Sequence, residues 1–574
     1  MTTAPIPRAA DGFFHPAKES EVIALVNHAR ENGLQVRARG ATHSVSFSIY
    51  TDPVDGDPAD NKTLEQSPPA GPNIDLALDK MIALTWSDKT PGVVEVEAGC
   101  HLGLDPSDPF GSSTLENSFL YQAYLNGWAV NIVGGITHQT VSGFTAMGSA
   151  GGSIQYAYDN ILAFRVVDGL GQASWIESDD PIFGAMLTSV GLLGIVTAMR
   201  FQLVPMYNVT GTVVTTPATL TSPPGVAVCP VDLFGAGSAT QPSLQKFLTD
   251  QPYSRLTWWP QNGCERVQVW QAGRSAASDT ALVPYREFPN SLKGQAEQLA
   301  ASTIYVLTGN TSLKQILTLI GSNVGKFHSN LSAMWGKSLP VAGQLGAVAV
   351  TAVLGAMVHL VGLVLGSVPG SMQRLFPKIL PLFAPLSKAG DAAPFHDWYW
   401  RSLCMDNTAD DQLLGTEFIE IWVPIQHTQR VMKLFRAMFE EHGSKATGYY
   451  AQEIYAAAPT PAWINPSYSD GTDEYKDGVS RFDVYWYRED DGTPNLKHAF
   501  FTQYWDLLRK HGVPFRFHWG KFIPFYDFPG WAAYYRSQLP RYDDFLALRE
   551  QRDPANVFFT EYWQLRLLGK TLAG

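Results

Sequence analysis

Two stretches rich in glycine and small residues are the first segments of this sequence that could do chemistry. Gly40–Ser44 (GATHS) ends the alternating segment LQVRARG, and residues 134–153 hold six glycines. Backbone N–H groups approach a phosphate closely where no side chain blocks them, so the two stretches could bracket a pyrophosphate. Glycines that only form turns and allow tight packing are the other interpretation. His43 lies in the first stretch and, taken alone, could be an ordinary loop histidine.

The elements that would position these stretches alternate between helices and strands. Residues 20–32 predict an amphipathic helix that ends at Gly33. Period-two or continuously apolar segments predict strands at LQVRARG, VVEVEAG, ILAFRVV, FIEIWVP and RFDVYWY. Neither glycine stretch matches GxGxxG or the P-loop fingerprint, which excludes Rossmann and P-loop folds as first interpretations. The pattern indicates an α+β chain of two units with a boundary near residue 205.

The length and composition of the chain limit the classes of protein to which it can belong. With 574 residues, two or three domains are expected, and a net charge of −12 without basic runs argues against nucleic acid as a partner. Only 16% of the residues are charged and 45% are hydrophobic, which excludes a disordered chain. The four cysteines lie far apart without Cys/His ligand spacing, so neither a disulfide framework nor a metal site is expected. No signal peptide is recognised, and a cytoplasmic location is expected.

One apolar segment stands out. Residues 338–373 contain no Asp, Glu, Lys or Arg, and 345–368 is long enough to cross a bilayer as a helix. A span would put two halves of one domain on opposite sides of a membrane, so we favour peripheral membrane contact through 341–368. A bilayer span, a buried pair of short helices and a hydrophobic substrate entrance stay open as alternatives.

An ordered set of motifs resembles a known family. VRARGATHS, VEVEAG, TVSGFTAMGSAGGS, DPIFG with GLLGIVT, FRFHWGK and DPANVFFTEYW occur in the order of the vanillyl-alcohol-oxidase superfamily of PCMH-type FAD-binding flavoproteins. The sequence is most similar to the aldonolactone oxidases (L-gulonolactone and D-arabinonolactone oxidases) and the alditol oxidases. The resemblance runs from about Phe13 to Leu568.

The resemblance implies an α+β fold with three parts. A two-subdomain FAD-binding domain would occupy 1–205, and a substrate (cap) domain with an antiparallel sheet would occupy 206–530. The apolar insert near 338–386 would belong to the cap domain. The C-terminal segment 531–574 would return to the FAD-binding domain.

FAD is the cofactor that the resemblance implies, with His43 bonded covalently to the flavin. The other implied cofactor residues are Arg39, Gly40, Ala41, Thr42, Ser44, Ser142, Gly143, Gly148, Ser149, Gly152, Gly194, Ile195 and Val196. One departure concerns a Gly-Thr-His-Gly stretch that many relatives have. This sequence reads GSAG at 148–151 instead, so backbone contacts are expected there rather than side-chain contacts.

Four catalytic residues follow from the same resemblance. Glu453 matches the glutamate of a Glu-Ile-Arg triplet, whose polar side chains share one face of a strand. Tyr455 stands where the arginine would be, so a neutral phenol replaces a planar cation and favours a more apolar alcohol or a lactone. Lys521 would lie near the flavin or the substrate oxygen, and His518 would orient or accept a proton. If the resemblance is set aside, Glu453 could be a solvated carboxylate on a strand, and His518 and Lys521 could lie in an ordinary surface turn.

The resulting main hypothesis is an FAD-dependent oxidoreductase that oxidises a secondary alcohol of a sugar-derived lactone, with dioxygen or another acceptor. A flavin oxidase of an apolar alcohol, such as a sterol or terpenoid, is the alternative. A catalytically inactive, membrane-associated flavin-binding protein is the third interpretation.

Overall fold

The computed structural model describes residues 4–51, 71–105, 108–157, 160–261, 263–285, 380–381, 384–405, 416–442, 449–487 and 496–572. The predicted membrane-contact segment 341–368 lies outside these residues, as does most of the insert near 338–386. Across the described ranges, no helix combines the length and apolar character that a membrane crossing needs.

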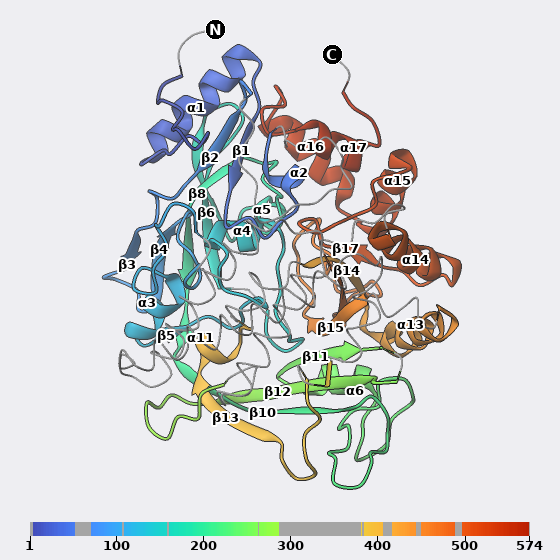
Figure 1. Ribbon diagram of the computed structural model, residues 1–574. Coiled ribbons are helices and arrows are strands. Elements are labelled where there is room, and N and C mark those ends of the chain that lie inside the picture. The colour runs from blue at the N-terminus through green and yellow to red at the C-terminus, as the bar shows by residue number, and fades with distance from the viewer. Residues whose placement is uncertain are drawn as a thin grey trace, which may run out of the picture.

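The first unit is built around a five-stranded sheet with the order β3-β4-β8-β6-β7 (Figure 1). Its strands are β3 (Leu84–Trp86), β4 (Val93–Glu97), β6 (Ile161–Val167), β7 (Ala173–Glu177) and β8 (Ile195–Gln202). A separate parallel pair joins β1 (Val36–Arg39) to β2 (Ile74–Ala77). The helices of this unit are α1 (Glu19–Asn32), α2 (Ser46–Ile49), α3 (Phe119–Leu125), α4 (Val141–Ala146) and α5 (Phe183–Met186). Two short strands, β5 (Trp128–Ala129) and β9 (Val204–Pro205), pair with each other.

Local sequence patterns explain several of these elements. The predicted helix at 20–32 is confirmed as α1, which buries Val22, Leu25 and Val26 and ends at Gly33 with a left-handed φ of +65°. The predicted strand at ILAFRVV is confirmed as β6, which pairs antiparallel with β7 across a glycine turn. Both follow from short-range periodicity and from glycine at the turn or cap, which tertiary contacts did not override.

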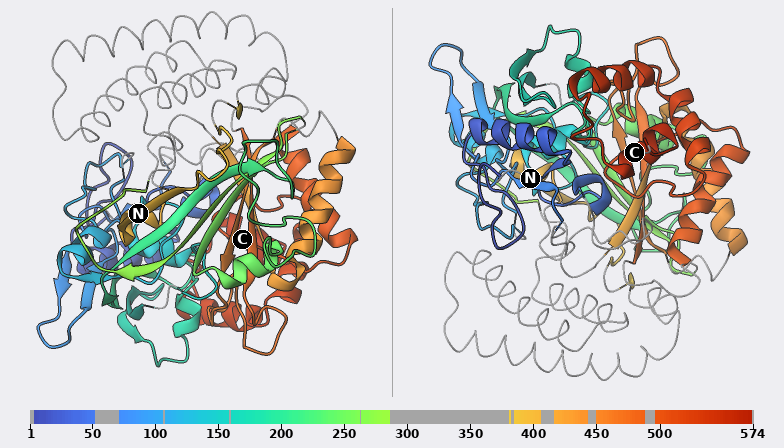
Figure 2. Two further views of the ribbon diagram at one scale, coloured as in Figure 1. Left: turned by 90° about the horizontal axis from the view of Figure 1, so that it is seen from below. Right: turned by 90° about the horizontal axis from the view of Figure 1, so that it is seen from above.

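The second unit is an eight-stranded sheet with the order β13-β10-β12-β11-β15-β16-β14-β17, and all its pairs are antiparallel. Its strands are β10 (Tyr207–Pro217), β11 (Tyr253–Trp259), β12 (Arg266–Ala276), β13 (Ala393–Trp398), β14 (Thr416–Pro424), β15 (Tyr449–Ala457), β16 (Val479–Tyr487) and β17 (Arg516–Phe517). Seen from below, its long green strands run from beside the blue first unit to the orange helices (Figure 2). The chain therefore has the α+β fold class expected from its sequence.

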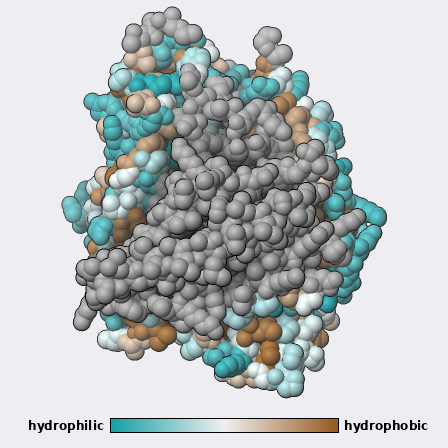
Figure 3. All heavy atoms as spheres, in the orientation of Figure 1, coloured by the Kyte–Doolittle hydropathy of each residue, from teal (hydrophilic) through white to brown (hydrophobic). Residues whose placement is uncertain are grey.

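Helices cover the outer side of this sheet. In Figure 1, α13 (Thr428–His442), α14 (Leu496–Lys510) and α15 (Phe528–Gln538) follow one another along the right edge, beside β14 to β17. The remaining helices are α6 (Leu244–Asp250), α11 (Tyr399–Ser402), the 3-10 turn η1 (Ile425–His427), α16 (Tyr542–Arg552) and α17 (Glu561–Leu568). Figure 3 shows mainly hydrophilic residues along the left and right edges of the described surface, with hydrophobic groups at the lower edge.

The C-terminal residues pack against the first unit. The Val36 N–H donates to the Val557 carbonyl at 2.7 Å, and the indole N–H of Trp563 donates to the Ser48 carbonyl at 3.2 Å. Arg37, which is 3% exposed, donates to the carbonyl of Phe558. Figure 1 shows α16 and α17 beside α2 and β1. The end of the chain thus helps to hold the strand that leads into the first glycine turn.

Candidate functional site

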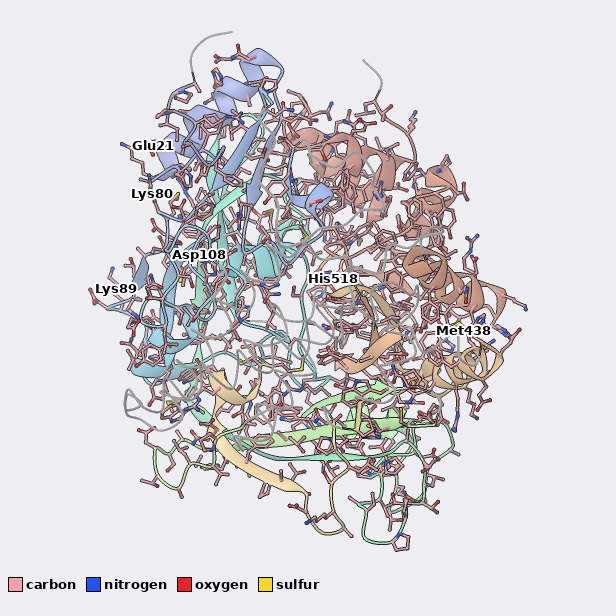
Figure 4. The ribbon with its side chains drawn as sticks, viewed as in Figure 1. Glu21, Lys80, Lys89, Asp108, Met438 and His518 are labelled. Atoms are coloured by element: carbon pink, nitrogen blue, oxygen red, sulfur yellow. The ribbon has the colours of Figure 1, made fainter. Side chains whose placement is uncertain are left out.

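A cavity opens where β1 ends, and its empty space, including the open solvent at its mouth, is about 1220 Å³. Its wall combines the turn after β1, the loop before α4, the start of β8 and the segment 518–521, which follows β17. Figure 4 labels two residues of this wall, Asp108 on the first unit and His518 nearer the C-terminal helices. The cavity therefore joins the two units.

Most of the residues predicted to bind a cofactor line this cavity. They are Arg39, Gly40, Ala41, Thr42, His43, Ser44, Ser142, Gly143, Ser149, Gly194, Ile195 and Val196. Gly148 and Gly152 do not line it: the Gly148 carbonyl accepts a bond from the Asn465 amide, and Gly152 lines a second cavity. His518 and Lys521 also line the first cavity, whereas Glu453 and Tyr455 do not.

The first glycine turn lies in the wall of the cavity and carries backbone N–H donors. Thr42 has a φ of +60°, and within the described ranges no protein acceptor takes the N–H of Ala41, Thr42 or Ser44. A Cβ at Gly40 would lie 2.8 Å from Oγ1 of Thr140, so glycine is needed for this close approach. Amide donors on a wall without bulky side chains suit an anionic diphosphate. These residues therefore fit the diphosphate of FAD.

Arg39 adds a cation to the same wall. Its guanidinium lies 5.3 Å from the ring centroid of Phe13 and 5.0 Å from that of Phe110, and its Nε donates to the Gly40 carbonyl. Asp108 also lines the cavity, but backbone N–H groups of Phe110 and Ser113 donate to its carboxylate. The two aromatic contacts and the carbonyl bond hold the Arg39 guanidinium beside the glycine turn.

The segment 518–521 docks directly on the glycine turn, although 478 residues separate His43 from Lys521. The Lys521 ammonium donates to the His43 carbonyl at 3.0 Å, and the Val45 N–H donates to the Gly520 carbonyl at 2.8 Å. A Cβ at Gly520 would lie 2.7 Å from Oγ of Ser44, so glycine permits this contact. The fold thereby places an imidazole and an ammonium beside the candidate cofactor loop.

His518 is neutral near pH 7. Burial, and to a smaller extent the positive charges of Lys521 and Arg481, lower the pKa of His518 to about 4. The Gly520 N–H donates to Nδ1 of His518 at 3.2 Å, so Nδ1 is the acceptor and Nε2 carries the proton. A neutral ring in this tautomer can donate a hydrogen bond from Nε2 but cannot take a proton there. Of the two roles predicted for His518, this geometry favours orientation over proton acceptance.

Glu453 and Tyr455 lie on β15 and bond to each other. The Tyr455 hydroxyl donates to Oε2 of Glu453 at 2.6 Å, and the Tyr485 hydroxyl donates to the same oxygen at 3.0 Å. Burial raises the pKa of Glu453 despite these two hydrogen bonds. The Tyr485 ring stacks on Phe418 at 4.5 Å, and the Lys521 ammonium lies 4.0 Å from the Phe418 centroid. Glu453 is thus linked to the cavity wall through two aromatic rings.

A buried group of charges beside Glu453 was not predicted from the sequence. Arg481 bonds to Asp483 through both Nε and Nη2, and its Nε lies 3.6 Å from Oε2 of Glu420. Burial opposes ionisation of Glu420, but Arg481, His518 and Lys521 outweigh it and lower the pKa of Glu420. A sequence signal exists, because FIEIWVP and RFDVYWY each place charged residues inside a strand that is otherwise mainly apolar and aromatic.

A second, smaller cavity is lined in part by Tyr455. Its wall is mainly glycine, aliphatic and aromatic, with one cation. The lining residues include Gly134, Gly135, Gly151, Gly152, Ile132, Val133, Leu403, Trp270, Tyr253, Tyr455 and Arg255. Tyr455 therefore contributes to a mostly apolar recess rather than to the first cavity.

Comparison with known proteins relates this geometry to flavin oxidases. No protein-family model matches the chain. The chain is 27% identical over 209 residues to a D-arabinono-1,4-lactone oxidase of Eremothecium gossypii and 28% identical over 212 residues to that of Saccharomyces cerevisiae. Each match covers 35% of this chain and 33% of the relative, so the chain matches about a third of the length of these curated relatives.

Solved structures resemble nearly the whole chain. A cholesterol oxidase from B. sterolicum matches with a TM-score of 0.61 and 16% identity, covering 96% of this chain and 93% of that one. A solvent-stable cholesterol oxidase matches with a TM-score of 0.55 and 15% identity, covering 96% and 94%. At such identities the likeness shows the fold. The chain is thus similar to two groups of FAD-binding PCMH-type oxidases: to lactone oxidases in sequence over about a third of its length, and to cholesterol oxidases in fold.

Proposed function

We propose that the chain is an FAD-dependent oxidoreductase that oxidises a secondary alcohol of a sugar-derived lactone. One observation carries the proposal: a single cavity is lined by the glycine turn, where the N–H groups of Ala41, Thr42 and Ser44 meet no protein acceptor within the described ranges, and by His518 with Lys521 beside that turn. Binding of a diphosphate cofactor and polarisation of a substrate oxygen can therefore occur in one place. The similarity to D-arabinono-1,4-lactone oxidases supports the lactone class.

The turn Gly40–Ser44 would hold the cofactor diphosphate, and the backbone at 194–196 would contact the adenosine part. FAD, when bound, supplies the acceptor for the hydride that leaves the carbinol carbon. We propose His43 as the residue bonded covalently to the flavin. We also propose that dioxygen or another acceptor takes the electrons from the flavin. Peripheral membrane contact through 341–368 is part of the same proposal.

The chain's own residues would share the remaining work. Glu453, whose pKa burial raises toward the range of a general base, would accept the proton of the Tyr455 hydroxyl as that hydroxyl takes the hydroxyl proton of the substrate. Lys521 would place positive charge where the substrate oxygen becomes negative. His518 would donate a hydrogen bond from Nε2, because its Nδ1 is occupied by the Gly520 N–H.

An apolar alcohol is the second candidate substrate. The recess beside Tyr455 has a mainly apolar wall that includes Ile132, Val133, Leu403 and Trp270. The fold similarity to cholesterol oxidases is compatible with this candidate but concerns the fold alone. Nothing in the described part of the site favours an inactive protein, because Glu453, His518 and Lys521 are all present.

A substrate panel separates these candidates. The flavin-loaded protein would be mixed anaerobically with aldonolactones and, separately, with sterols and terpenoid alcohols, while the flavin absorbance is followed. We expect D-arabinono-1,4-lactone or a close analogue to bleach the flavin at least tenfold faster than any sterol. Faster reduction by sterols would replace the lactone proposal with the second candidate, and reduction by neither class would support an inactive flavoprotein.

A further inference from the structure

Two rows of side chains cross the inner strands of the eight-stranded sheet. Residues paired directly across antiparallel strands lie on the same face, and so do residues two apart on one strand. The first row, from β12 to β14, is Trp270, Arg255, Tyr455, Arg481 and Trp422. The second row is Gln268, Thr257, Glu453, Asp483 and Glu420. One face therefore carries a row of cations and aromatic rings beside a row with three carboxylates.

Arg481 is the group on which the two rows converge. It is 7% exposed and bonds to Asp483 at 2.9 Å through Nε and at 2.5 Å through Nη2. Its guanidinium carbon lies 4.4 Å from the ring centroid of Tyr455 and 5.6 Å from that of Trp422. A planar guanidinium that is paired on its edge and stacked on its face has one orientation, which lysine could not reproduce.

Arg481 also crosses from the sheet to the first unit. Its Nη1 donates to the Ala150 carbonyl at 2.7 Å. Ala150 follows Ser149, which lines the first cavity, and precedes Gly151 and Gly152, which line the second. The guanidinium thus fixes the sheet against the backbone that separates the two cavities.

We propose that Arg481 is a positioning residue for the proton-accepting pair, holding the Tyr455 ring so that its hydroxyl binds Glu453 beside the cofactor domain. This inference rests on the proposed function for the role of Glu453. The contacts connect these residues in order. Asp483 and Ala150 bind the Arg481 guanidinium, which stacks on the Tyr455 ring. The Tyr455 hydroxyl in turn binds the Glu453 carboxylate.

The charge of Arg481 would act on Glu453 as well. The titratable and charged groups around Glu453 are Tyr455 on its own strand, Arg255 on β11, and Arg481, Asp483 and Tyr485 on β16. Arg481 lowers the pKa of Glu453 against the larger effect of burial, which raises it. Loss of the cation therefore raises this pKa further, and the carboxylate then loses its proton only at higher pH.

Three variants distinguish the effect of the orientation of the Arg481 side chain from the effect of its charge. R481K keeps a cation but loses the fork to Asp483, and we expect at least tenfold slower flavin reduction by substrate with a small change in its pH profile. R481Q removes the cation, and we expect the acid limb of that profile to move up by about one pH unit. R481Q/D483N also replaces Asp483, whose pKa burial raises well above its usual range, so the limb should stay as high as in R481Q and the rate should stay low.

An infrared titration gives a readout that needs no substrate. The carbonyl-stretch band of protonated Glu453, assigned by its loss in E453Q, would be followed against pH in the flavin-loaded protein and each variant. Its midpoint should rise in R481Q and stay raised in R481Q/D483N, because the buried Asp483 carboxyl carries no charge once Arg481 is gone. If no alcohol reduces the flavin, the proposed function fails while this titration still tests Arg481.

Arg516 provides a matched control. It is 4% exposed on β17, lies opposite Trp422, and donates to the backbone carbonyls of Gln538 and Tyr468. R516Q should lower stability without moving the Glu453 midpoint. If R481Q does not fold, because Asp483 is left buried and unpaired, R481K and R481Q/D483N carry the test. Midpoints and rates in the Arg481 variants equal to those of R516Q would overturn the proposal.

Discussion

His43 is held at its backbone by the other end of the chain, since Lys521 binds its carbonyl. The His43 ring lies 5.6 Å from the ring of His138, and the His138 carbonyl accepts a bond from His101. Three histidines, His43, His101 and His518, line the cavity. Each of these three imidazoles has a position from which it could bond to a flavin. The proposed link through His43 must therefore be tested against another histidine of the cavity wall.

We expect His43→Ala to abolish covalent attachment. After acid precipitation, flavin should stay with the wild-type polypeptide and appear in the supernatant of the variant, because no imidazole remains at the linkage position. His101→Ala, which alters another histidine of the cavity wall, should keep the flavin attached. Flavin that stays with the polypeptide in His43→Ala, or leaves it in His101→Ala alone, would refute the assignment to His43.

At the residue scale, the sequence predicted which residues line the cavity better than it predicted which residues pair across the eight-stranded sheet. Gly40–Ser44 and Lys521 belong to motifs with recognisable order, and the structure brings them into contact. Arg481 and Glu420 carried only a weak signal, a charge inside an aromatic strand. Their partners are set by strand register over long separations, which period-two patterning does not encode.

Among the elements, β8 shows how backbone conformation shapes the cavity. Gly194 precedes this strand with a φ of +139°, and a Cβ there would lie 2.6 Å from both Cγ1 of Val166 and the carbonyl oxygen of Val167. Only glycine fits this approach of β8 to β6 without strain. The position matters for the cofactor as well, because residues 194–196 line the cavity.

Gly194→Ala should therefore lower the free energy of unfolding by about 2 to 4 kcal/mol, through backbone strain together with steric overlap. Gly471→Ala is the control, since Gly471 has a φ of +85° but a Cβ there would meet no atom of the described residues within 4 Å. Its cost should be only the strain, about 1 kcal/mol. Denaturant unfolding of both variants measures the difference, and equal losses would show that the contact with β6 is unimportant.

Elements with local signals were predictable, whereas their assembly was not. Trp258 and Trp259 of β11 are buried in the core. However, β11 pairs with β15, which lies almost 200 residues later in the chain, and this pairing sets Arg255 opposite Tyr455. Such pairings depend on packing of whole faces rather than on the periodicity of either strand.

At the scale of the whole molecule, two segments of the C-terminal part of the chain contact the first unit. Gly520 and Lys521 hold the glycine turn, and Val557 and Trp563 hold β1 and α2. The resemblance implied such a return of the C-terminal segment, but composition and periodicity alone did not. The cavity consequently exists only when residues from both ends of the chain are assembled.

The central claim is that this assembled cavity holds a redox-active FAD. The most direct measurement is the visible absorption spectrum of the purified protein, recorded before and after anaerobic addition of D-arabinono-1,4-lactone. We expect an oxidised flavin spectrum, about one FAD per chain, and bleaching by the lactone. A purified, folded protein that carries no flavin, and that binds none when FAD is added, would contradict the claim.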